Sequence, residues 1–195
     1  MWRGDWQMIE LKYFDRSDFK QLIDWIESPQ FLLQWSGPFF EFPLTANQLE
    51  KYIEKANRDD SETLAFKVID QESGKTIGHI SLGRIDRKNQ SARVGKVLVG
   101  DQAVRGKGIG LQMIKEILKI AFDELHLHRV SLGVFEFNHS AIACYEKAGF
   151  QKEGLLRDER KFGNEYWGLW EMSILEHEWE KLKSFPISQV ERGCN

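Results

Sequence analysis

The chain of 195 residues is long enough for one domain with a hydrophobic core of ordinary size. Hydrophobic residues make up 42% of it and charged residues 29%, proportions that are typical of a globular protein and exclude an intrinsically disordered one. Because the formal net charge is -3, no overall positive field attracts nucleic acid or an anionic membrane.

The cysteine content and the first residues indicate a cytoplasmic protein. The two cysteines, Cys144 and Cys194, form no disulfide framework and suit a reducing compartment. The opening "MWRGDWQMIELK" has early charges and no apolar stretch long enough for a signal peptide. No segment approaches the roughly 18 apolar residues of a membrane-spanning helix. Without repeats or a linker, residues 1–195 are expected to form a single domain.

The first third of the chain predicts one strand and two helices. Alternation of apolar and polar residues over 8–14 is typical of a strand. Apolar residues at helical spacing predict helices over 17–27 and 45–56, each with a hydroxyl residue as N-cap. The intervening segment 28–43 is rich in aromatic residues and is expected to be a loop. The two N-caps are expected to be Ser17 and Thr45.

The middle of the chain predicts an antiparallel meander followed by a helix. Three strand-like runs, at 63–70, 76–85 and 91–99, are separated by short polar turns. A helix follows over about 109–124.

The last third predicts a strand over 129–138, a short helix over 140–150, a hairpin around Gly163–Asn164 and a closing helix near 176–184. The short helix is expected to have Ser140 as its N-cap and Gly149 as its C-terminal stop. This order of elements predicts an α/β (α+β) domain with a mixed sheet.

A glycine-rich segment precedes the longest predicted helix. In "VRGKGIG", Gly106, Gly108 and Gly110 stand at alternate positions. The first amides of a helix have no intrahelical acceptor and favour an anion, and glycines let a phosphate approach the backbone. Arg105 and Lys107 add positive charge, so a pyrophosphate suits this segment. A flexible turn with two solvated cations is the alternative.

Two other phosphate-binding motifs fit this segment poorly. A Walker A loop needs Ser or Thr after its Gly-Lys pair, but Gly106–Lys107 is followed by Gly108. A dinucleotide-binding G-x-G-x-x-G pattern needs glycine where Leu111 or Met113 stands. These mismatches argue against a nucleoside triphosphate or a dinucleotide as the ligand.

The pattern R-x-x-G-x-G over residues 105–110 resembles the acyl-CoA pyrophosphate loop of the GNAT acetyltransferases, since it follows a strand and precedes a long helix. The segment "NHSAIACYEKAGF" resembles the second motif of that family, and two motifs in the right order are more specific than one. The resemblance covers about residues 7–180, and the ending "GNEYWGLWEMSILEHEW" is similar to the ribosomal-protein-alanine N-acetyltransferase branch. The positions that match the second motif are Asn138, Ser140, Tyr145, Gly149 and Phe150.

The resemblance implies a single GNAT-like domain with a mostly antiparallel sheet flanked by helices, and acetyl-CoA as the cosubstrate. It implies direct attack of a neutral amine on the thioester carbonyl. Main-chain groups of Leu98 and Val99 would pair with pantetheine and stabilise the oxyanion, while Tyr145 would protonate the departing thiolate. The cofactor-binding residues it implies are Leu98, Val99, Arg105, Gly106, Lys107, Gly108, Ile109, Gly110, Asn138, Ser140 and Tyr145.

Structural alternatives stay open for these residues. Leu98 and Val99 also suit an ordinary buried strand, and Tyr145 suits a core aromatic at helical spacing from Ile142. The side chain of Asn138 also suits closing a turn before the helix.

The general base is missing from its usual place. Many family members carry a glutamate on the strand before the loop, but the matching stretch "SARVGKVL" has no carboxylate. Another acid, an ordered water or an already deprotonated substrate would then be required. Cys144 is expected to be an inert buried thiol. Other residues, none assigned as catalytic because a structural role is favoured for each, are Glu41, Glu136, Glu171 and His79.

No metal site is expected, because His126 and His128 lack further ligands nearby in the sequence. The acceptor is expected to be a primary amine of a small molecule or a peptide N-terminus, with neither nucleic acid nor membrane as a partner. A homodimer stays open. The aromatic residues of 28–43 suit either a wall of the acceptor pocket, with Glu41 meeting the amine, or a small satellite core. These residues are Phe31, Trp35, Phe39, Phe40 and Phe42.

Three other functions are compatible with parts of the sequence. A non-catalytic acyl-CoA sensor would explain the missing strand glutamate but not Tyr145. A nucleotide-binding module would leave the segment from Asn138 to Phe150 unexplained, and a purely structural interaction domain would leave the glycine segment unexplained.

Overall fold

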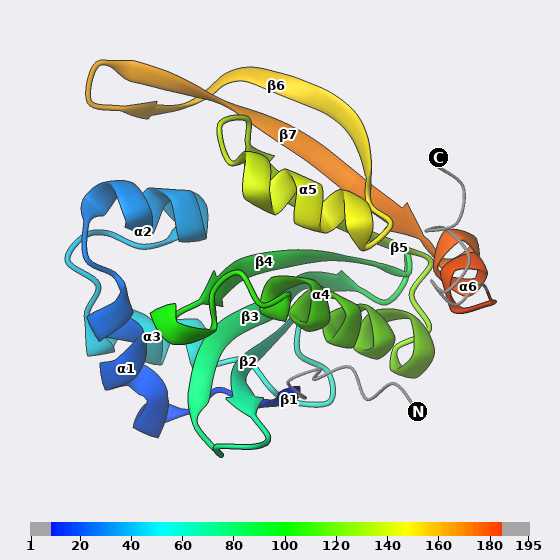
Figure 1. Ribbon diagram of the computed structural model, residues 1–195, viewed down its shortest axis with the longest axis horizontal. Coiled ribbons are helices and arrows are strands. Elements are labelled where there is room, and N and C mark those ends of the chain that lie inside the picture. The colour runs from blue at the N-terminus through cyan, green and yellow to red at the C-terminus, as the bar shows by residue number, and fades with distance from the viewer. Residues whose placement is uncertain (1–8, 185–195) are drawn as a thin grey trace, which may run out of the picture.

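The computed structural model describes residues 9–184, so Met8, at the start of the first predicted strand, and Cys194 lie outside the described part (Figure 1). The strands are β1 (Ile9–Tyr13), β2 (Thr63–Asp70), β3 (Thr76–Asp86), β4 (Ser91–Val99), β5 (Arg129–Phe135), β6 (Gln151–Phe162) and β7 (Glu165–Leu175). The helices are α1 (Phe19–Trp25), α2 (Pro29–Ser36), α3 (Ala46–Ile53), α4 (Ile109–Lys119), α5 (His139–Lys147) and α6 (Glu176–Ser184).

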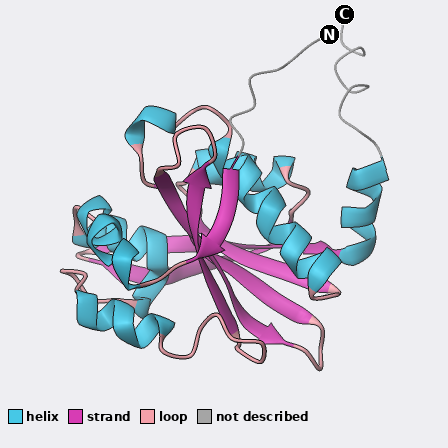
Figure 2. Ribbon diagram, turned by 90° about the horizontal axis from the view of Figure 1, so that it is seen from below, coloured by secondary structure: helices cyan, strands magenta, loops and turns pink. Residues whose placement is uncertain are grey.

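All seven strands belong to one twisted sheet in the order β1-β2-β3-β4-β5-β7-β6. Each neighbouring pair is antiparallel except β4 and β5, which are parallel. A parallel pair needs a crossover connection, which here contains the glycine segment and α4. Helices lie on both sides of the sheet (Figure 2). The predicted α+β domain with a mixed, mostly antiparallel sheet is confirmed.

Helix α4 is fixed to the sheet by one apolar face. Met113, Ile114, Ile117 and Leu118 recur at helical spacing and are completely buried in the main core. Burying each of these side chains contributes roughly 1.5–3 kcal/mol to the free energy of folding. This packing sets the position of the helix start, and therefore of the glycine segment before it.

The prediction of a loop over 28–43 is wrong in its first half, where α2 forms. Ser28 is the N-cap, and its Oγ accepts a hydrogen bond from the N–H of Phe31 at 3.1 Å. Pro29 occupies the first helical position, where its missing N–H costs no hydrogen bond. Gly37, with φ of +58°, ends the helix. A capping serine, a proline and a stopping glycine are all visible in the sequence, but the aromatic content obscured them.

The first predicted N-cap is wrong, because Asp15, in place of Ser17, caps the 3-10 turn Arg16–Asp18 that leads directly into α1. The Oδ1 atom of Asp15 accepts the N–H of Ser17 at 2.8 Å, and Asp18 Oδ2 accepts the N–H of Asp15 at 3.0 Å. This reciprocal capping box satisfies two amides, which a serine already inside the turn cannot do. The predicted cap at Thr45 is confirmed, since its side chain accepts from Gln48 N–H.

The predicted N-cap at Ser140 is also wrong, because Asn138 caps α5. Its Oδ1 accepts the N–H of Ala141 at 3.3 Å and the hydroxyl of Ser140 at 3.2 Å. The strand before it ends at Phe135 because the N–H of Asn138 closes a turn onto the Phe135 carbonyl. Gly149, with φ of +100°, stops the helix as predicted.

Gly78 on β3 is required where the strand lies close to the edge of β4. A Cβ atom there would lie 2.4 Å from the carbonyl oxygen of Leu98. We expect Gly78→Ala to lower the free energy of unfolding by about 1–3 kcal/mol, because backbone must shift to admit the methyl group. Denaturant unfolding checks this. Gly154→Ala, where a Cβ meets nothing within 4 Å, is the control, and equal losses in both variants would contradict the explanation.

Candidate active site

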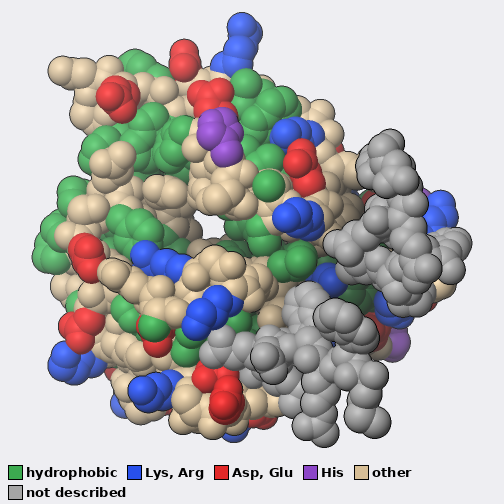
Figure 3. Space-filling view, in the orientation of Figure 1, with side chains coloured by type: hydrophobic (Ala, Val, Ile, Leu, Met, Phe, Trp, Pro, Cys, Tyr) green, Lys and Arg blue, Asp and Glu red, His purple; other side chains and the backbone are tan. Residues whose placement is uncertain are grey.

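The cavity that contains most of the predicted site residues opens where β4 and β5 separate. The two strands pair only over Ser91–Arg93 and Arg129–Ser131. Beyond these residues they diverge, and a cavity of about 590 Å³ lies between them, visible as a hollow in the middle of the face in Figure 3. Its walls come from 94–99 of β4, 132–135 of β5, the glycine segment, α5 and α2.

A bulge distorts β4 beside this cavity. Leu98 pairs with His79 and Gly95 with Ser81, so two β4 residues face a single β3 residue. Lys96, in the bulge, has φ of +50°. Leu98 and Val99 both line the cavity, as predicted, and Leu98 also packs into the core beside α1 and α3. The buried-strand reading of Leu98 is confirmed, and the pairing of its main chain with pantetheine stays a prediction.

The glycine segment presents bare backbone to the cavity. Gly106 and Gly108 have φ of +77° and +78°, in the left-handed region that favours glycine, and a Cβ at either would meet nothing within 4 Å. Gly108 is the N-cap of α4 and provides no side-chain cap for the first amides of the helix. Open space, positive partial charge and an absent side chain fit a phosphate group.

The remaining residues of this segment divide into two groups. Arg105 lines the cavity, and its guanidinium donates to the carbonyl of Val99 at 3.1 Å, which anchors the segment to the end of β4. Gly110 also lines the cavity. In contrast, Lys107 is exposed and Ile109 is buried in the core, and neither side chain belongs to the wall.

Helix α5 and its N-cap contribute the other predicted residues. Asn138, Ser140 and Tyr145 all line the cavity. Tyr145 is only 9% exposed, and burial raises the pKa of its hydroxyl, with Cys144 as a second cause. The phenol therefore stays protonated near neutral pH, as a proton donor must. No hydrogen bond occupies its hydroxyl among the residues that the structure describes.

Cys144 also lines the cavity, but it lacks the environment of a nucleophile. Burial raises the pKa of its thiol and outweighs the opposing effect of the Lys147 charge, so the reactive thiolate is disfavoured. The expectation of an inert thiol agrees with this environment.

None of the three carboxylates considered as a base is free at the cavity. Glu171 forms a bidentate ion pair with Arg93. Glu136 accepts the N–H of Gly168 on β7 at 3.1 Å and does not line the cavity. Glu41 is exposed and lines neither this cavity nor the larger one beside it.

His79 is a buried neutral residue outside the wall. It is 1% exposed, its Nε2 lies 3.3 Å from the hydroxyl of Tyr52, and the rings of Phe14 and Trp35 pack against it edge-on. Burial, with a smaller contribution from the charge of Lys96, lowers its pKa to about 3. At neutral pH it therefore carries no charge, and it lines neither cavity.

The buried imidazole predicts acid sensitivity of the fold. Because the folded pKa is below the unfolded value near 6.5, stability is full above pH 6.5 and falls as pH drops toward 3. Between pH 7 and pH 5 this residue should remove about 2 kcal/mol from the free energy of unfolding. Denaturant unfolding at both pH values measures it. His79→Gln should reduce this pH dependence, and the exposed His177→Gln should leave it unchanged; the same slope in all three proteins would contradict the assignment.

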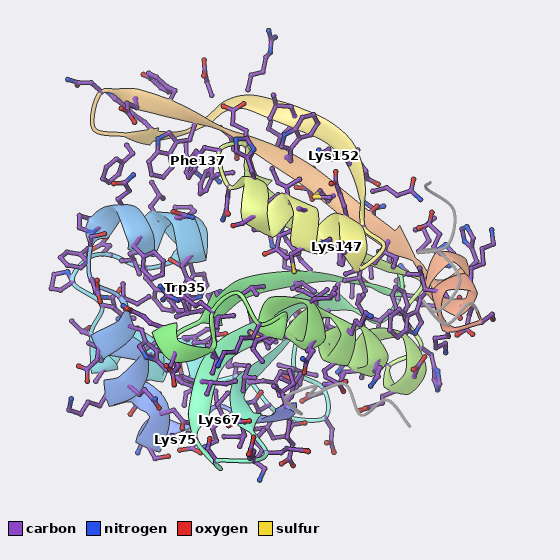
Figure 4. The ribbon with its side chains drawn as sticks, in the orientation of Figure 1. Trp35, Lys67, Lys75, Phe137, Lys147 and Lys152 are labelled. Atoms are coloured by element: carbon purple, nitrogen blue, oxygen red, sulfur yellow. The ribbon has the colours of Figure 1, made fainter. Side chains whose placement is uncertain are left out.

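A second cavity of about 730 Å³ adjoins the first and shares its wall at Gln34, Trp35, Gly95, Lys96 and Phe135, among others. The β6–β7 hairpin and α2 both contribute to it (Figures 1 and 4). The site thus has two connected compartments with Lys96 between them.

The aromatic residues of 28–43 are divided between a satellite core and the walls of the two cavities. Trp35 and Phe40 stack with ring centroids 5.8 Å apart in a satellite core with α1 and α3. Trp35 also lines both cavities, Phe31 lines the first and Phe39 the second. Phe42 is 45% exposed.

Several wall residues were absent from the sequence prediction, among them Gln34, Lys96 and Lys147. Lys147 had a usable signal, because Ser140, Cys144 and Lys147 fall on one helical face of α5. Figure 4 shows Lys147 between α5 and α4, and Trp35 between α2 and the lower half of the sheet. For Lys96 the signal is a strand bulge, which local sequence does not reveal.

Within residues 9–184, no group of three or more His, Cys, Asp or Glu side chains is arranged to hold a metal ion. His128 lies 3.7 Å from Glu176 instead, at the surface. None of the described helices is both long and apolar enough to cross a membrane.

Comparison with known proteins agrees with this architecture. Residues 9–151 match the model of the acetyltransferase (GNAT) domain. The chain is 32% identical over 143 residues to a probable N-acetyltransferase, YjcK, of Bacillus subtilis, which covers 73% of this chain and 75% of the relative. It is 28% identical over 177 residues to the putative ribosomal N-acetyltransferase YdaF of the same organism, covering 90% and 95%.

A solved structure shows the same fold. The crystal structure of spermidine N-acetyltransferase from Vibrio cholerae in complex with CoA and spermine superposes with a TM-score of 0.75 at 25% identity, covering 88% of this chain and 98% of that one. The separated strands β4 and β5, the bare glycine segment and the family match all agree. This chain therefore belongs to the GNAT acetyltransferases and is an acetyl-CoA-dependent N-acetyltransferase.

Proposed function

We propose that the first cavity binds acetyl-CoA and that the second receives the acceptor, a primary amine of a small molecule or of a peptide N-terminus. The observation that supports this most is that the glycine segment, the edge of β4 and Tyr145 all line one cavity. The ribosomal-protein-alanine branch is a narrower proposal, supported by the likeness to YdaF. We also keep a single domain over 1–195 and a cytoplasmic location as predictions.

The roles of the residues follow from their positions. Backbone amides of 106–111, with Arg105, would bind the pyrophosphate, and the Leu98–Val99 edge would pair with pantetheine. The carbonyl of Val99 already accepts a hydrogen bond from Arg105, which holds the glycine segment next to this edge. Asn138 Oδ1 is used by the helix cap, which leaves its amide nitrogen available.

Acetyl-CoA supplies the thioester whose carbonyl carbon is attacked. The acceptor nitrogen forms the new C–N bond while the C–S bond breaks, and Tyr145 Oη donates its proton to the leaving sulfur. The proton lost by the nitrogen passes to water, because none of the described candidate carboxylates is free at the cavity. Tyr145 recovers its proton from solvent after release.

A non-catalytic acyl-CoA sensor is the second candidate, favoured by the strand "SARVGKVL" having no carboxylate. A turnover assay separates the two. The protein is incubated with acetyl-CoA and a panel of primary amines and amine-terminated peptides, while free thiol and the acetylated product mass are followed. Amine-dependent thiol release supports the transferase. Tight acetyl-CoA binding without thiol release for any amine would favour the sensor.

A further inference from the structure

The second cavity has a charge pattern that acetyl transfer alone does not require. Glu171 is held by both terminal nitrogens of Arg93, and Glu159 lies 2.7 Å from Arg160. Every carboxylate of the wall therefore already has a cationic partner. The charged residues of the wall are Arg84, Arg93, Lys96, Arg160, Glu159 and Glu171.

Two cations of this wall, Lys96 and Arg84, have no carboxylate partner among residues 9–184. The ammonium of Lys96 lies over aromatic rings, 4.1 Å from the centroid of Phe39, 4.8 Å from Tyr52 and 5.8 Å from Phe40. Ring faces stabilise a cation but neutralise no charge. The cavity therefore keeps two uncompensated positive charges.

The environment of Lys96 shows that its charge is costly in the absence of an anion. Burial, and then repulsion by Arg84, lower the pKa of Lys96 to about 8. A nearby opposite charge would favour the ammonium form. An anion bound in the second cavity would therefore stabilise the ammonium of Lys96, which is poorly solvated when no anion is bound.

Bulges in two neighbouring strands place these cations on the same cavity. Arg84 lies where the pairing of β3 with β4 shifts register, and Lys96 lies in the bulge of β4. Their φ angles are +51° and +50°, a region that residues other than glycine adopt infrequently. A bulge changes the direction of a side chain relative to a regular strand. Both unpaired cations thus extend from irregular backbone into the wall of the second cavity.

We infer that the acceptor carries, besides its amine, a carboxylate or phosphate group that Lys96 and Arg84 bind in the second cavity. This inference rests on the proposed function, since it assigns the acceptor of that same site. Lys96 lines both cavities, so an anion bound there leaves the amine of a small acceptor close to the first cavity. A polycation such as spermine, the ligand in the Vibrio cholerae structure, would instead meet two like charges.

Matched acceptors test the inference by kinetics. The kcat/KM for acetylation is measured for 4-aminobutyrate and its amide, for a tetrapeptide and its C-terminal amide, for phosphoethanolamine and ethanolamine, and for spermidine. For at least one pair, the kcat/KM of the anionic compound should exceed that of its neutral partner by about tenfold, which is the usual effect of one charge-assisted contact. The carboxylate and phosphate pairs show which anion is preferred. Equal rates within every pair, or preference for spermidine, would overturn the inference.

Variants that remove a charge test whether Lys96 and Arg84 cause the preference for an anionic acceptor. Lys96→Gln and Arg84→Gln should each reduce the ratio of acid to neutral partner, and Lys96→Arg should restore most of it. Lys88→Gln, at an exposed lysine in the turn between β3 and β4, is the matched control for charge loss and should keep the full ratio. An unchanged ratio in the Lys96 and Arg84 variants would overturn the assignment.

A binding experiment distinguishes failure of this inference from failure of the proposed function. Thermal unfolding is followed with acetyl-CoA alone, and with CoA plus each compound of the matched pairs at equal ionic strength. Stabilisation by acetyl-CoA but by no anionic compound beyond its neutral partner would refute the anion site and leave the cofactor site standing. Absence of any acetyl-CoA effect would refute the proposed function, whatever the anions do.

Discussion

Tyr145→Phe is expected to lower kcat by about 100-fold or more while changing the affinity for acetyl-CoA by much less. The variant removes only the hydroxyl, and general acid catalysis typically contributes 10²–10⁴-fold to a rate. The ring itself stays in the main core beside Phe150, at a centroid distance of 6.2 Å, so the fold should persist. The measurement is kcat for the best amine, together with the dissociation constant of acetyl-CoA from titration.

The control is Tyr166→Phe, because Tyr166 lies 57% exposed on β7, outside both cavities. It should leave both quantities unchanged. A Tyr145→Phe enzyme with normal kcat would remove this residue as the acid. A parallel loss of affinity and stability would instead indicate that the hydroxyl only supports packing.

Gly108→Asp is expected to weaken acetyl-CoA binding at least about tenfold more than Gly108→Asn does. The two side chains have nearly the same shape, and both tolerate the left-handed conformation at φ of +78° better than most residues. They differ in one negative charge, placed where the phosphate groups should lie. The comparison therefore separates repulsion of the pyrophosphate from backbone strain. Isothermal titration with acetyl-CoA measures both affinities.

Gly74 supplies a control position for the same pair of substitutions. It has φ of +68° in the turn between β2 and β3, and a Cβ there also meets open space. Gly74→Asp and Gly74→Asn should have the same affinity as the parent chain. If Gly108→Asp and Gly108→Asn bound acetyl-CoA equally well, the glycine segment would not be the pyrophosphate site.

The glycine segment and the order of elements could be predicted from the sequence because each depends on local patterns. Gly106 and Gly108 adopt left-handed conformations that a glycine allows, and the buried face of α4 repeats at helical spacing. The hairpin turn at Gly163 was predictable for the same reason. Local chemistry of this kind changes little with the rest of the fold.

Errors arose where several residues compete for one role. Ser17 and Ser140 are both good N-cap residues, but Asp15 caps the 3-10 turn that leads into α1 and Asn138 caps α5. The short helix α2 was missed because its aromatic content suggested a loop, although Ser28 provided a cap.

The acceptor compartment could not be predicted because it depends on register. Lys96 reads as an ordinary strand residue until the pairing of Leu98 with His79 and Gly95 with Ser81 reveals the bulge. Likewise, only the folded structure shows that Glu171 forms an ion pair with Arg93, while Lys96 has no carboxylate partner among residues 9–184. Pairing of charges from separate strands depends on tertiary structure, and the proposed preference for an anionic acceptor depends on that pairing.

The most direct test of the central claim is thermal unfolding of the parent chain with acetyl-CoA, CoA, ATP and NAD, each added separately. A ligand at about one hundred times its dissociation constant should add roughly 2.7 kcal/mol to the free energy of unfolding. We expect a clear rise in Tm with acetyl-CoA and CoA and none with NAD or ATP. No rise with either CoA compound, on well-folded protein, would contradict the assignment of the cavity between β4 and β5.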